Sequence, residues 1–406
     1  MLKKVMIGEI CDVSSAGDKP LIFNTEISSN CVIPVIANGV DNNGVIGYTD
    51  KAKVFNEAIT VSARGNVGTA FYRNYPYYPV IRLLTIVPKN YQDLDCKYLY
   101  YLLNNSPLKG IGSVQAQLTV PDVLKIEVFY EDDYNLQKSI ANILFNIDSL
   151  IANNNVICSN LEAMAKLLYD YWFVQFDFPD ENGKPYKSSG GKMVWNEDLK
   201  RKIPDGWEVI SFDKCITSIN TGLNPRDNFK LNNGGTIKYL TVKNLTTEGT
   251  IDFASCDFID ETARKVVHKR SDIQVGDILF ASIAPLGRCF IILEQPKDWD
   301  INESVFSIRP NYNNMVSSFL YMTFMSEYFI KKTEASSVGS VFKGIRISEL
   351  QDMKMFLPPK SLLDKFDLHL IDMLKMKYVL FEENQHLASL RDFLLPMLMN
   401  GQVKVG

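Results

Sequence analysis

The feature that most constrains this chain is an internal repeat at the ends of two long helical patterns. Leu161-Glu162-Ala163-Met164 and Leu167-Leu168 are matched by Leu387-Ala388-Ser389-Leu390 and Leu394-Leu395, an offset of 226 residues (387 minus 161) in a chain of 406. An offset of about half the chain indicates one unit, a globular region followed by a long helix, that is used twice. A protein built in this way is expected to contact its partner twice.

The first helical pattern begins at Leu136, where apolar positions start to advance alternately by four and three residues. They are Leu136, Ile140, Ile143, Ile147, Leu150, Asn154, Ile157, Leu161, Met164, Leu168 and Tyr171. This heptad spacing predicts a helix that packs along its length against another helix. Asn154 is the polar member at the middle of the seam, where a buried Asn fixes the register at some cost in stability. The alternative is that Asn154 faces solvent.

A second apolar stripe follows Pro358-Pro359 and ends before Gly401. Its members are Phe366, Leu370, Met373, Leu380, Leu387, Leu390 and Leu394. Two long helices of matched length most simply pair with each other inside one chain. Because a long globular insert separates them, we expect an antiparallel coiled coil.

The two globular regions consist of short β-branched and aromatic runs separated by Gly, Asn, Asp and Pro, a pattern typical of strands and turns. The clearest predicted strands are 32–35, 58–61, 80–84, 237–240, 277–280 and 290–293, and short helices are predicted near 98–103 and 319–329. We therefore predict an α+β fold with an internal pseudo-repeat. Its parts are β-rich domains at 1–132 and 205–358, long helices at 133–176 and 359–401, and a linker at 177–204.

Composition excludes several classes of protein. Glu9 and Asp12 interrupt the first apolar run too early for a signal peptide, and no stretch is long enough to span a bilayer, so we expect a cytoplasmic protein without a membrane partner. Seven scattered cysteines without a Cys-x-x-Cys pair, and three histidines outside ligand spacing, argue against a disulfide framework and a metal site. A net charge of −4 argues against gripping nucleic acid by bulk charge alone, although local patches remain possible.

Three passages, taken in order, resemble the specificity subunits of type I restriction-modification enzymes, and the resemblance covers essentially the whole chain. They are Leu168-Tyr169-Asp170-Tyr171-Trp172-Phe173-Val174-Gln175-Phe176, then Pro204-Asp205-Gly206-Trp207, then Leu390-Arg391-Asp392-Phe393-Leu394-Leu395-Pro396-Met397-Leu398-Met399-Asn400-Gly401-Gln402. The resemblance implies two target-recognition domains that each read half of a split target in double-stranded DNA. It also implies that the helices set the half-site spacing and bind two modification (methyltransferase) subunits.

The same resemblance implies that separate restriction (translocase-nuclease) subunits complete the enzyme. S-adenosylmethionine, ATP and magnesium are then expected on those partner subunits, with no cofactor bound by this chain. The duplicated layout agrees with this role, because two readers on one spacer must contact DNA at a fixed separation. Since the interiors of the two domains are unlike in sequence, the target should be bipartite and asymmetric.

Base edges are read by Arg, Lys, Asn and Gln, so these residue types in Gly-rich loops are the candidates for contact with DNA. In the first domain they are Asn38, Asn42, Arg64, Asn66, Gln115 and Gln117. In the second domain they are Lys243, Asn244, Arg264, Lys265, Lys269, Arg270, Arg288, Lys343 and Arg346. Arg64 leads because its small neighbours Ala63 and Gly65 permit close approach to a base. The alternatives are that the Asn-Gly pairs are only turns and that the basic run around His268 is a solvated face.

Other functions fit this sequence less well. A methyltransferase would carry an Asn- or Asp-Pro-Pro-aromatic tetrapeptide and a Gly-rich cofactor loop, and neither occurs. Asp95-Cys96-Lys97 is too common a pattern to indicate a nuclease. A specificity subunit from a system with a fused modification-restriction subunit would share the whole domain plan, and a scaffold that does not bind DNA would share the paired helices. The sequence favours a noncatalytic DNA-specificity subunit and leaves these two alternatives open.

Overall fold

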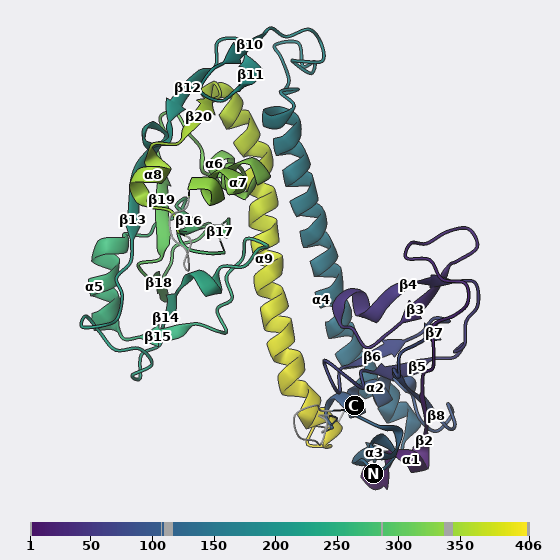
Figure 1. Cartoon of the computed structure of the whole chain (residues 1–406). Helices are drawn as coiled ribbons and strands as arrows, with labels where there is room; N and C mark the ends of the chain where they lie inside the picture. Colours follow the sequence, from purple (N-terminus) through teal and green to yellow (C-terminus); the bar gives the residue numbers. More distant parts are fainter. Residues whose placement is uncertain (1, 107, 109–116, 286, 337–343, 404–406) are drawn as a thin grey trace. The chain divides into compact units, whose positions relative to one another are not determined.

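The computed structural model describes residues 2–106, 108, 117–285, 287–336 and 344–403. The chain divides into two compact units, Met1–Asn153 with Glu383–Gly406, and Asn154–Glu382. Each unit holds one β-rich domain and part of both long helices, α4 (Tyr134–Tyr169) and α9 (Lys360–Met399) (Figure 1). The predicted α+β class with an internal repeat is confirmed.

The first domain lies in the first unit, and its strands form three small sheets of order β1-β9, β2-β8-β5-β6 and β4-β3-β7. The strands are β1 (Leu2–Met6), β2 (Cys11–Ser15), β3 (Ile33–Ile36), β4 (Val45–Thr49), β5 (Ala58–Val61), β6 (Ala70–Arg73), β7 (Tyr78–Pro79), β8 (Leu84–Pro88) and β9 (Glu127–Glu131). The helices are α1 (Ile7–Ile10), η1 (Asp41–Gly44), α2 (Cys96–Asn104) and α3 (Val120–Leu124). Helix α2 is capped by Asp95, whose carboxylate accepts from the amide of Tyr98, and it covers β5, β6 and β8.

The second domain, in the second unit, has sheets of order β12-β20, β13-β19-β16-β17 and β15-β14-β18. Its strands are β12 (Glu208–Ser211), β13 (Ile216–Thr221), β14 (Ile237–Leu240), β15 (Asp257–Ile259), β16 (Ile278–Ala281), β17 (Cys289–Ile291), β18 (Trp299–Ile301), β19 (Val305–Pro310) and β20 (Lys354–Leu357). Its helices are η3 (Phe212–Cys215), η4 (Val242–Asn244), α5 (Glu261–Ser271), α6 (Ser317–Met325), α7 (Glu327–Ser336) and α8 (Ile347–Gln351).

The two domains share one topology, strand for strand. Ile59 of β5 pairs with Ile86 of β8, and Ile278 of β16 pairs with Ile308 of β19 in the same antiparallel sense. In both domains a further strand, β7 or β18, runs parallel to the central strand of the smaller sheet. Helix α5 is an addition to the second domain, because residues 50–57 form no helix at the corresponding place between β4 and β5. The duplication read from the repeat is therefore a duplication of fold.

Helices α4 and α9 run antiparallel within each unit. In the first unit, Asp148 of α4 pairs with Arg391 of α9 at 2.9 Å, and the hydroxyl of Tyr101 from the first domain donates to the same carboxylate at 2.5 Å. In the second unit, Glu162 pairs with Lys377 at 2.7 Å, and the buried Lys377 ammonium also donates to the carbonyl of Glu248 in the second domain. The two ion pairs stand 14 residues apart on each helix (148 to 162, 377 to 391), which is two heptads.

The buried positions of α4 differ in part from the predicted seam. Ile140, Ile147 and Asn154 are buried as expected, but Leu150, Ile157, Met164 and Tyr171 are exposed. Ala165 and Tyr169 are buried in their place, and Ile151 and Cys158 are half-buried. The heptad period is confirmed, and Leu136 and Ile143 are half-buried against the core. From Leu150 onward this heptad position is wrong, because large apolar side chains alone do not reveal which of two neighbouring stripes faces the partner helix.

An aromatic cluster forms the centre of the second unit. Phe173 lies 4.7 Å from Phe319 and 4.9 Å from Phe366 between ring centroids, which joins the π-helical turn η2 (Asp170–Val174), directly after α4, to α6 and α9. Trp207 packs on Phe178 and Phe176 at 5.2 and 5.5 Å. The segment predicted as a linker is thus more ordered than expected, since it also contains the hairpin β10 (Met193–Asn196) and β11 (Arg201–Pro204). The aromatic passages that carried the family resemblance are largely core residues.

Most predicted strands are observed within one or two residues of their expected bounds. The exception is 80–84, a Val-Ile-Arg-Leu-Leu run that the sequence assigns to a strand. In the structure the strand β8 begins at Leu84, and Ile81 and Arg82 form a turn with positive φ angles of 55° and 59°.

Candidate nucleic-acid interface

Four of the first-domain candidates, Asn38, Arg64, Asn66 and Gln117, lie around one junction of turns. Asn38 lies just after β3, and its carboxamide Oδ1 accepts from the amide of Ala63 at 2.7 Å while its Nδ2 donates to the carbonyl of Ile81. Both ends of the side chain are thus bound to backbone. Asn38 therefore positions the neighbouring turns and has no free amide end for a base edge.

Arg64 is exposed directly after that junction. Its Nη2 donates to Oε1 of Gln117 at 2.9 Å, so two predicted residues separated by 53 positions meet. Asn66 is exposed in the same turn, and Asn42 is exposed in η1 with a φ of 47°, where its Nδ2 makes only a 3.5 Å contact with the carbonyl of Val45. Gln115 lies outside the described residues. Arg64, Asn66 and Gln117 therefore remain a coherent candidate group, with Asn42 in a separate turn.

In the second domain, the densest basic run forms helix α5. Asp260 caps it by accepting from the amide of Ala263 at 2.8 Å, and Asp272 ends it in the left-handed conformation, with a φ of 44°. Lys265, Lys269 and Arg270 are exposed on this helix. The run was recognised from the sequence but its helix was not. Asp260 as an N-cap, followed by Ala263 and Val267 at helical spacing, was the available signal.

The opposite side of α5 is fastened to the domain. Arg264 donates from Nη2 to the carbonyl of Pro296 at 2.8 Å, so this candidate has a structural contact. His268 Nδ1 lies 3.0 Å from Oδ2 of Asp300, whose other oxygen accepts from the Ser271 hydroxyl at 2.6 Å. Burial raises the pKa of the Asp300 carboxyl above its ordinary value. These contacts fix which residues of α5 face outward.

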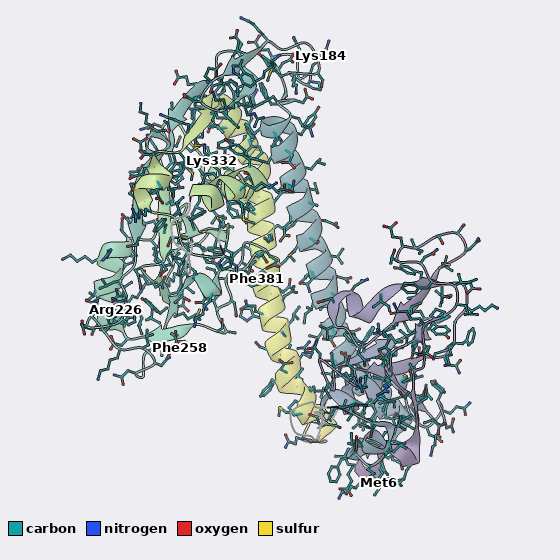
Figure 2. The ribbon with its side chains drawn as sticks, in the orientation of Figure 1. Met6, Lys184, Arg226, Phe258, Lys332 and Phe381 are labelled. Atoms are coloured by element: carbon teal, nitrogen blue, oxygen red, sulfur yellow. The ribbon has the colours of Figure 1, made fainter. Side chains whose placement is uncertain are left out.

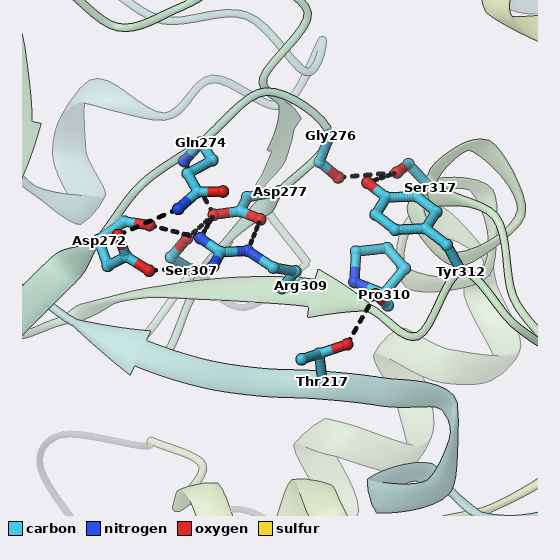
Figure 3. Close-up of polar contacts among 10 residues, drawn as sticks. All are labelled: Thr217, Asp272, Gln274, Gly276, Asp277, Ser307, Arg309, Pro310, Tyr312 and Ser317. Carbon is cyan, nitrogen blue, oxygen red and sulfur yellow. Dashed lines mark hydrogen bonds and ion pairs between the residues drawn. The ribbon is translucent and has the colours of Figure 1, made fainter.

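An ion network ties the C-terminal end of α5 to the sheet (Figure 3). The Arg309 guanidinium donates from Nε and Nη2 to Asp277 at 2.8 and 2.9 Å, and from Nη1 to Asp272 at 2.9 Å. Asp277 is buried and also accepts from the Ser307 hydroxyl at 3.0 Å. The Arg309 contact holds the pKa of Asp272 below its usual value. The network is structural, and it holds the C-terminal end of α5 in place.

Of three other second-domain candidates, two are buried or half-buried with hydrogen bonds inside the domain, and one is exposed. Asn244 has no exposed surface, so a base cannot reach it. Its Oδ1 accepts from the amide of Thr241 and its Nδ2 donates to the hydroxyl of Ser255. Arg288 is half-buried and donates to the carbonyl of Leu245 at 3.1 Å. Lys243 is exposed and lies 3.9 Å from Asp257.

The last two candidates are Lys343 and Arg346. Arg346 is exposed immediately before helix α8. Lys343 lies outside the described residues. The second-domain surface that remains available is formed by α5, Lys243 and Arg346.

A different surface is formed by the long helices. Apolar side chains that their mutual packing leaves exposed are Leu150, Leu390 and Phe393 in the first unit, and Val156, Ile157, Met164, Leu167, Leu368, Met376 and Val379 in the second. We call these residues the helix surface. In the second unit, a cavity of about 570 Å³ adjoins α4 and α9, and Ala165, Phe173, Met373 and Lys332 contribute to its lining. Lys332 of α7 is labelled in Figure 2.

Asn154 is buried, with 8% of its surface exposed, so the solvent-facing alternative is wrong. Within the described residues, no group of three or more His, Cys, Asp or Glu side chains is placed to hold a metal ion. No helix in that part of the chain combines the length and apolarity needed to cross a membrane.

Comparison with known proteins identifies the family. Residues 2–163 and 204–376 match the family described as the type I restriction modification DNA specificity domain. The MjaIX specificity subunit of Methanocaldococcus jannaschii, a type I restriction enzyme subunit, is 26% identical over 355 residues, covering 86% of this chain and 78% of the relative. The type I specificity subunit S.MpnORF89P of Mycoplasma pneumoniae is 32% identical over 172 residues, covering 42% of this chain and 50% of the relative.

Among solved structures, the S subunit of a type I restriction-modification system from M. genitalium superimposes with a TM-score of 0.69 at 18% identity. The superposition covers 98% of this chain and 96% of that one, and it establishes the shared fold. The family match spans most of the sequence and both of its β-rich domains. The chain therefore belongs to the type I restriction modification DNA specificity family, and its function is that of a specificity subunit.

Proposed function

We propose that this chain is a noncatalytic subunit that reads a bipartite, asymmetric target in double-stranded DNA and recruits the catalytic subunits to it. The observation that carries the proposal is the pair of domains with one strand order and different surfaces. Each domain would read one half-site. Helix α5 has no counterpart among the described residues of the first domain, where Arg64 and Gln117 form the candidate group instead, so the two half-sites should differ.

Contact with DNA is supported by local charge in a chain whose net charge is −4. Lys265, Lys269 and Arg270 provide cations on one exposed helix, suited to phosphate contacts that position the protein. Arg64 is suited to a base edge, because its guanidinium fork matches the acceptors of guanine. Arg64→Ala should then relax one half-site only, whereas uniform weakening at every site would assign Arg64 to a phosphate.

Recruitment of partners is supported by the helix surface. An exposed apolar side chain is ordinary when it stands alone, but a series of them along two paired helices fits a protein interface. We propose that two modification (methyltransferase) subunits dock there and that restriction subunits join them. S-adenosylmethionine, ATP and magnesium would be bound by those partners, with catalysis also theirs, and the complex would work in the cytoplasm.

Asn154 is proposed to fix the register of the helix pair. Asn154→Ile should leave or raise the stability of the pair, because an apolar side chain replaces a buried polar one, while it loosens the register. The readouts are thermal unfolding and the half-site spacing of the methylated motif. Unchanged spacing together with unchanged assembly would contradict the register role.

The proposal is tested by co-expressing this chain with the modification subunit encoded beside it, in a host free of DNA methylation, and mapping methylated adenines across the genome. A split, asymmetric motif that disappears when this chain is omitted is the expected result. A stable complex without any motif would favour the assembly scaffold. A partner that carries both modification and restriction activities would identify the alternative system with a fused subunit.

A further inference from the structure

The turn between β7 and β8 has an unusual backbone. Ile81 and Arg82 are consecutive non-glycine residues with φ angles of 55° and 59°. A β-branched residue such as Ile is disfavoured in this region because its Cβ substituents crowd the backbone. Such strain persists only where surrounding contacts impose it, and it occurs most often at functional sites.

The surrounding contacts here are backbone hydrogen bonds. The amide of Ile81 donates to the carbonyl of Gly17 at 2.9 Å, and the amide of Arg82 donates to that of Ala16 at 3.1 Å. The carbonyl of Ile81 accepts from Asn38 Nδ2. Nothing in this arrangement uses the side chain of Arg82, which is exposed and makes no hydrogen bond or ion pair with the described residues. Ile81 beside it is 51% exposed.

Asn38 also brings this turn next to the one that bears Arg64. Its Oδ1 accepts from the amide of Ala63, so one carboxamide joins the residue before Arg64 to the residue before Arg82. The hydroxyl of Ser62 donates to the Asn38 carbonyl at 3.1 Å and fixes the bridging residue itself. Arg64 and Arg82, which are 18 residues apart (82 minus 64), therefore stand in adjoining turns of the first domain.

The second domain shows that the bridge is a variation on the shared fold. There the equivalent turns bond directly, the amide and hydroxyl of Ser282 both donating to the carbonyl of Ser304 at 3.1 and 2.7 Å. Ser282 and Ser304 stand at the positions of Ala63 and Arg82, and neither has a positive φ. The first domain inserts the Asn38 carboxamide between the turns and places Arg82 in a strained conformation that the fold itself does not require.

We propose that Arg82 is a second base-reading arginine of the first domain, held beside Arg64 by the Asn38 carboxamide, and that its target is a guanine edge in the half-site read by this domain. The inference rests on the proposed function and adds a residue to it. An exposed guanidinium that no described residue engages presents the fork that pairs with O6 and N7 of guanine. A backbone held in a costly conformation is expected where the direction of that side chain matters.

The decisive variant is Arg82→Gly in the co-expressed complex. Glycine adopts a positive φ without strain, so the variant should fold at least as well as the parent, with an unchanged or higher unfolding temperature. It should nevertheless lose about 10-fold or more in discrimination at a guanine of one half-site, with the other half-site unaffected. If Arg82 had a purely structural role, Arg82→Gly would not combine an unchanged or higher unfolding temperature with weaker discrimination at that guanine.

Two further variants separate base contact from phosphate contact. Arg82→Lys keeps the charge but loses the fork, so it should also relax the motif. Lys51→Ala, which removes an exposed cation elsewhere in the same domain, should leave the methylated motif unchanged. An unchanged motif in Arg82→Gly, or weaker methylation spread evenly over all positions, would overturn the inference alone. The absence of any motif from the parent complex would overturn the proposed function and the inference with it.

Discussion

In the first domain, Ala58 and Val87 stand next to the paired Ile59 and Ile86 of β5 and β8, and apolar neighbours surround them. At the same places in the second domain, Asp277 and Arg309 stand next to Ile278 and Ile308, in the network of Figure 3. The residues next to the β5–β8 pair are therefore held by apolar packing, whereas those next to the β16–β19 pair form a buried ion pair. A duplicated fold keeps its strand pairing while the chemistry at equivalent positions changes.

The candidate recognition surfaces differ in the same way. The first domain presents arginines from turns that are held by the Asn38 carboxamide, whereas the second carries cations on the added helix α5. The ion network anchors that helix through Asp272, at its C-terminal end. The buried charge of the second domain is therefore connected to the element that distinguishes it from the first. We infer that the ion network and helix α5 act together, the network holding the helix in place on the second domain.

The largest expected effect comes from breaking the buried ion pair. Arg309→Met leaves Asp277 buried without its cation and should cost about 3–5 kcal/mol in the free energy of unfolding. Urea unfolding followed by tryptophan emission measures it selectively, because Trp172, Trp195, Trp207 and Trp299 all lie in the second unit. The double variant Asp277→Ala/Arg309→Val imitates the first domain and should recover most of the loss. A single-variant loss below about 1 kcal/mol would contradict a dominant role for the pair.

The next effect concerns the bridge in the first domain. Asn38→Asp keeps the acceptor for Ala63 but turns a second oxygen toward the Ile81 carbonyl, so it should destabilise this domain by about 1–3 kcal/mol. Hydrogen exchange should accelerate in peptides covering 58–88, while the tryptophan transition stays in place. Asn66→Asp, at an exposed site in the neighbouring turn, is the matched control. Equal exchange in the two variants would show that the bridge is dispensable.

A smaller effect is expected from the surface of α5. Lys265→Gln/Lys269→Gln removes two exposed cations from one face, and the slope of log affinity against log salt should fall by about 0.9 for each phosphate that is no longer neutralised. The methylated motif should keep its sequence, because phosphate contacts carry no base information. Lys184→Gln/Lys187→Gln removes the same charge from another part of the second unit, where Figure 2 labels Lys184, and should leave the slope unchanged. A relaxed motif would instead make α5 a base reader.

The smallest effect is a dependence on pH. Because the Arg309 hydrogen bond lowers the pKa of Asp272 in the folded chain, this carboxylate stabilises the second domain above the pKa of an unfolded Asp, about 3.9. The contribution is lost as the pH falls through the lower folded pKa. Asp272→Asn should therefore flatten the acid limb of the tryptophan-monitored stability curve below about pH 4, and Asp227→Asn, an exposed control, should not. Identical acid limbs in all three proteins would remove Asp272 from this account.

The sequence predicted the parts of the molecule that depend on periodicity. The repeat, the two long helices, their antiparallel pairing and most strands follow from patterns of apolar residues that any packed helix or sheet must have. Arg64 and Gln117 were both selected from residue type and neighbouring glycines, although their contact with each other was not foreseen. The basic run of α5 was visible as charge, while its anchoring by Asp300 was not.

Tertiary structure decided the matters that depend on partners distant in sequence. The run Val80-Ile81-Arg82-Leu83-Leu84 has every local feature of a strand. Its hydrogen bonds with Ala16, Gly17 and Asn38 nevertheless hold Ile81 and Arg82 in a left-handed turn. By residue type and position Asn244 is a candidate base reader, but in the structure it is buried and bonded to Thr241 and Ser255. Ile157 has the spacing of the helix seam, but its side chain is exposed. Local sequence fixes periodicity and propensity, whereas the direction of a polar or strained side chain is set by contacts that form only when distant segments pack together.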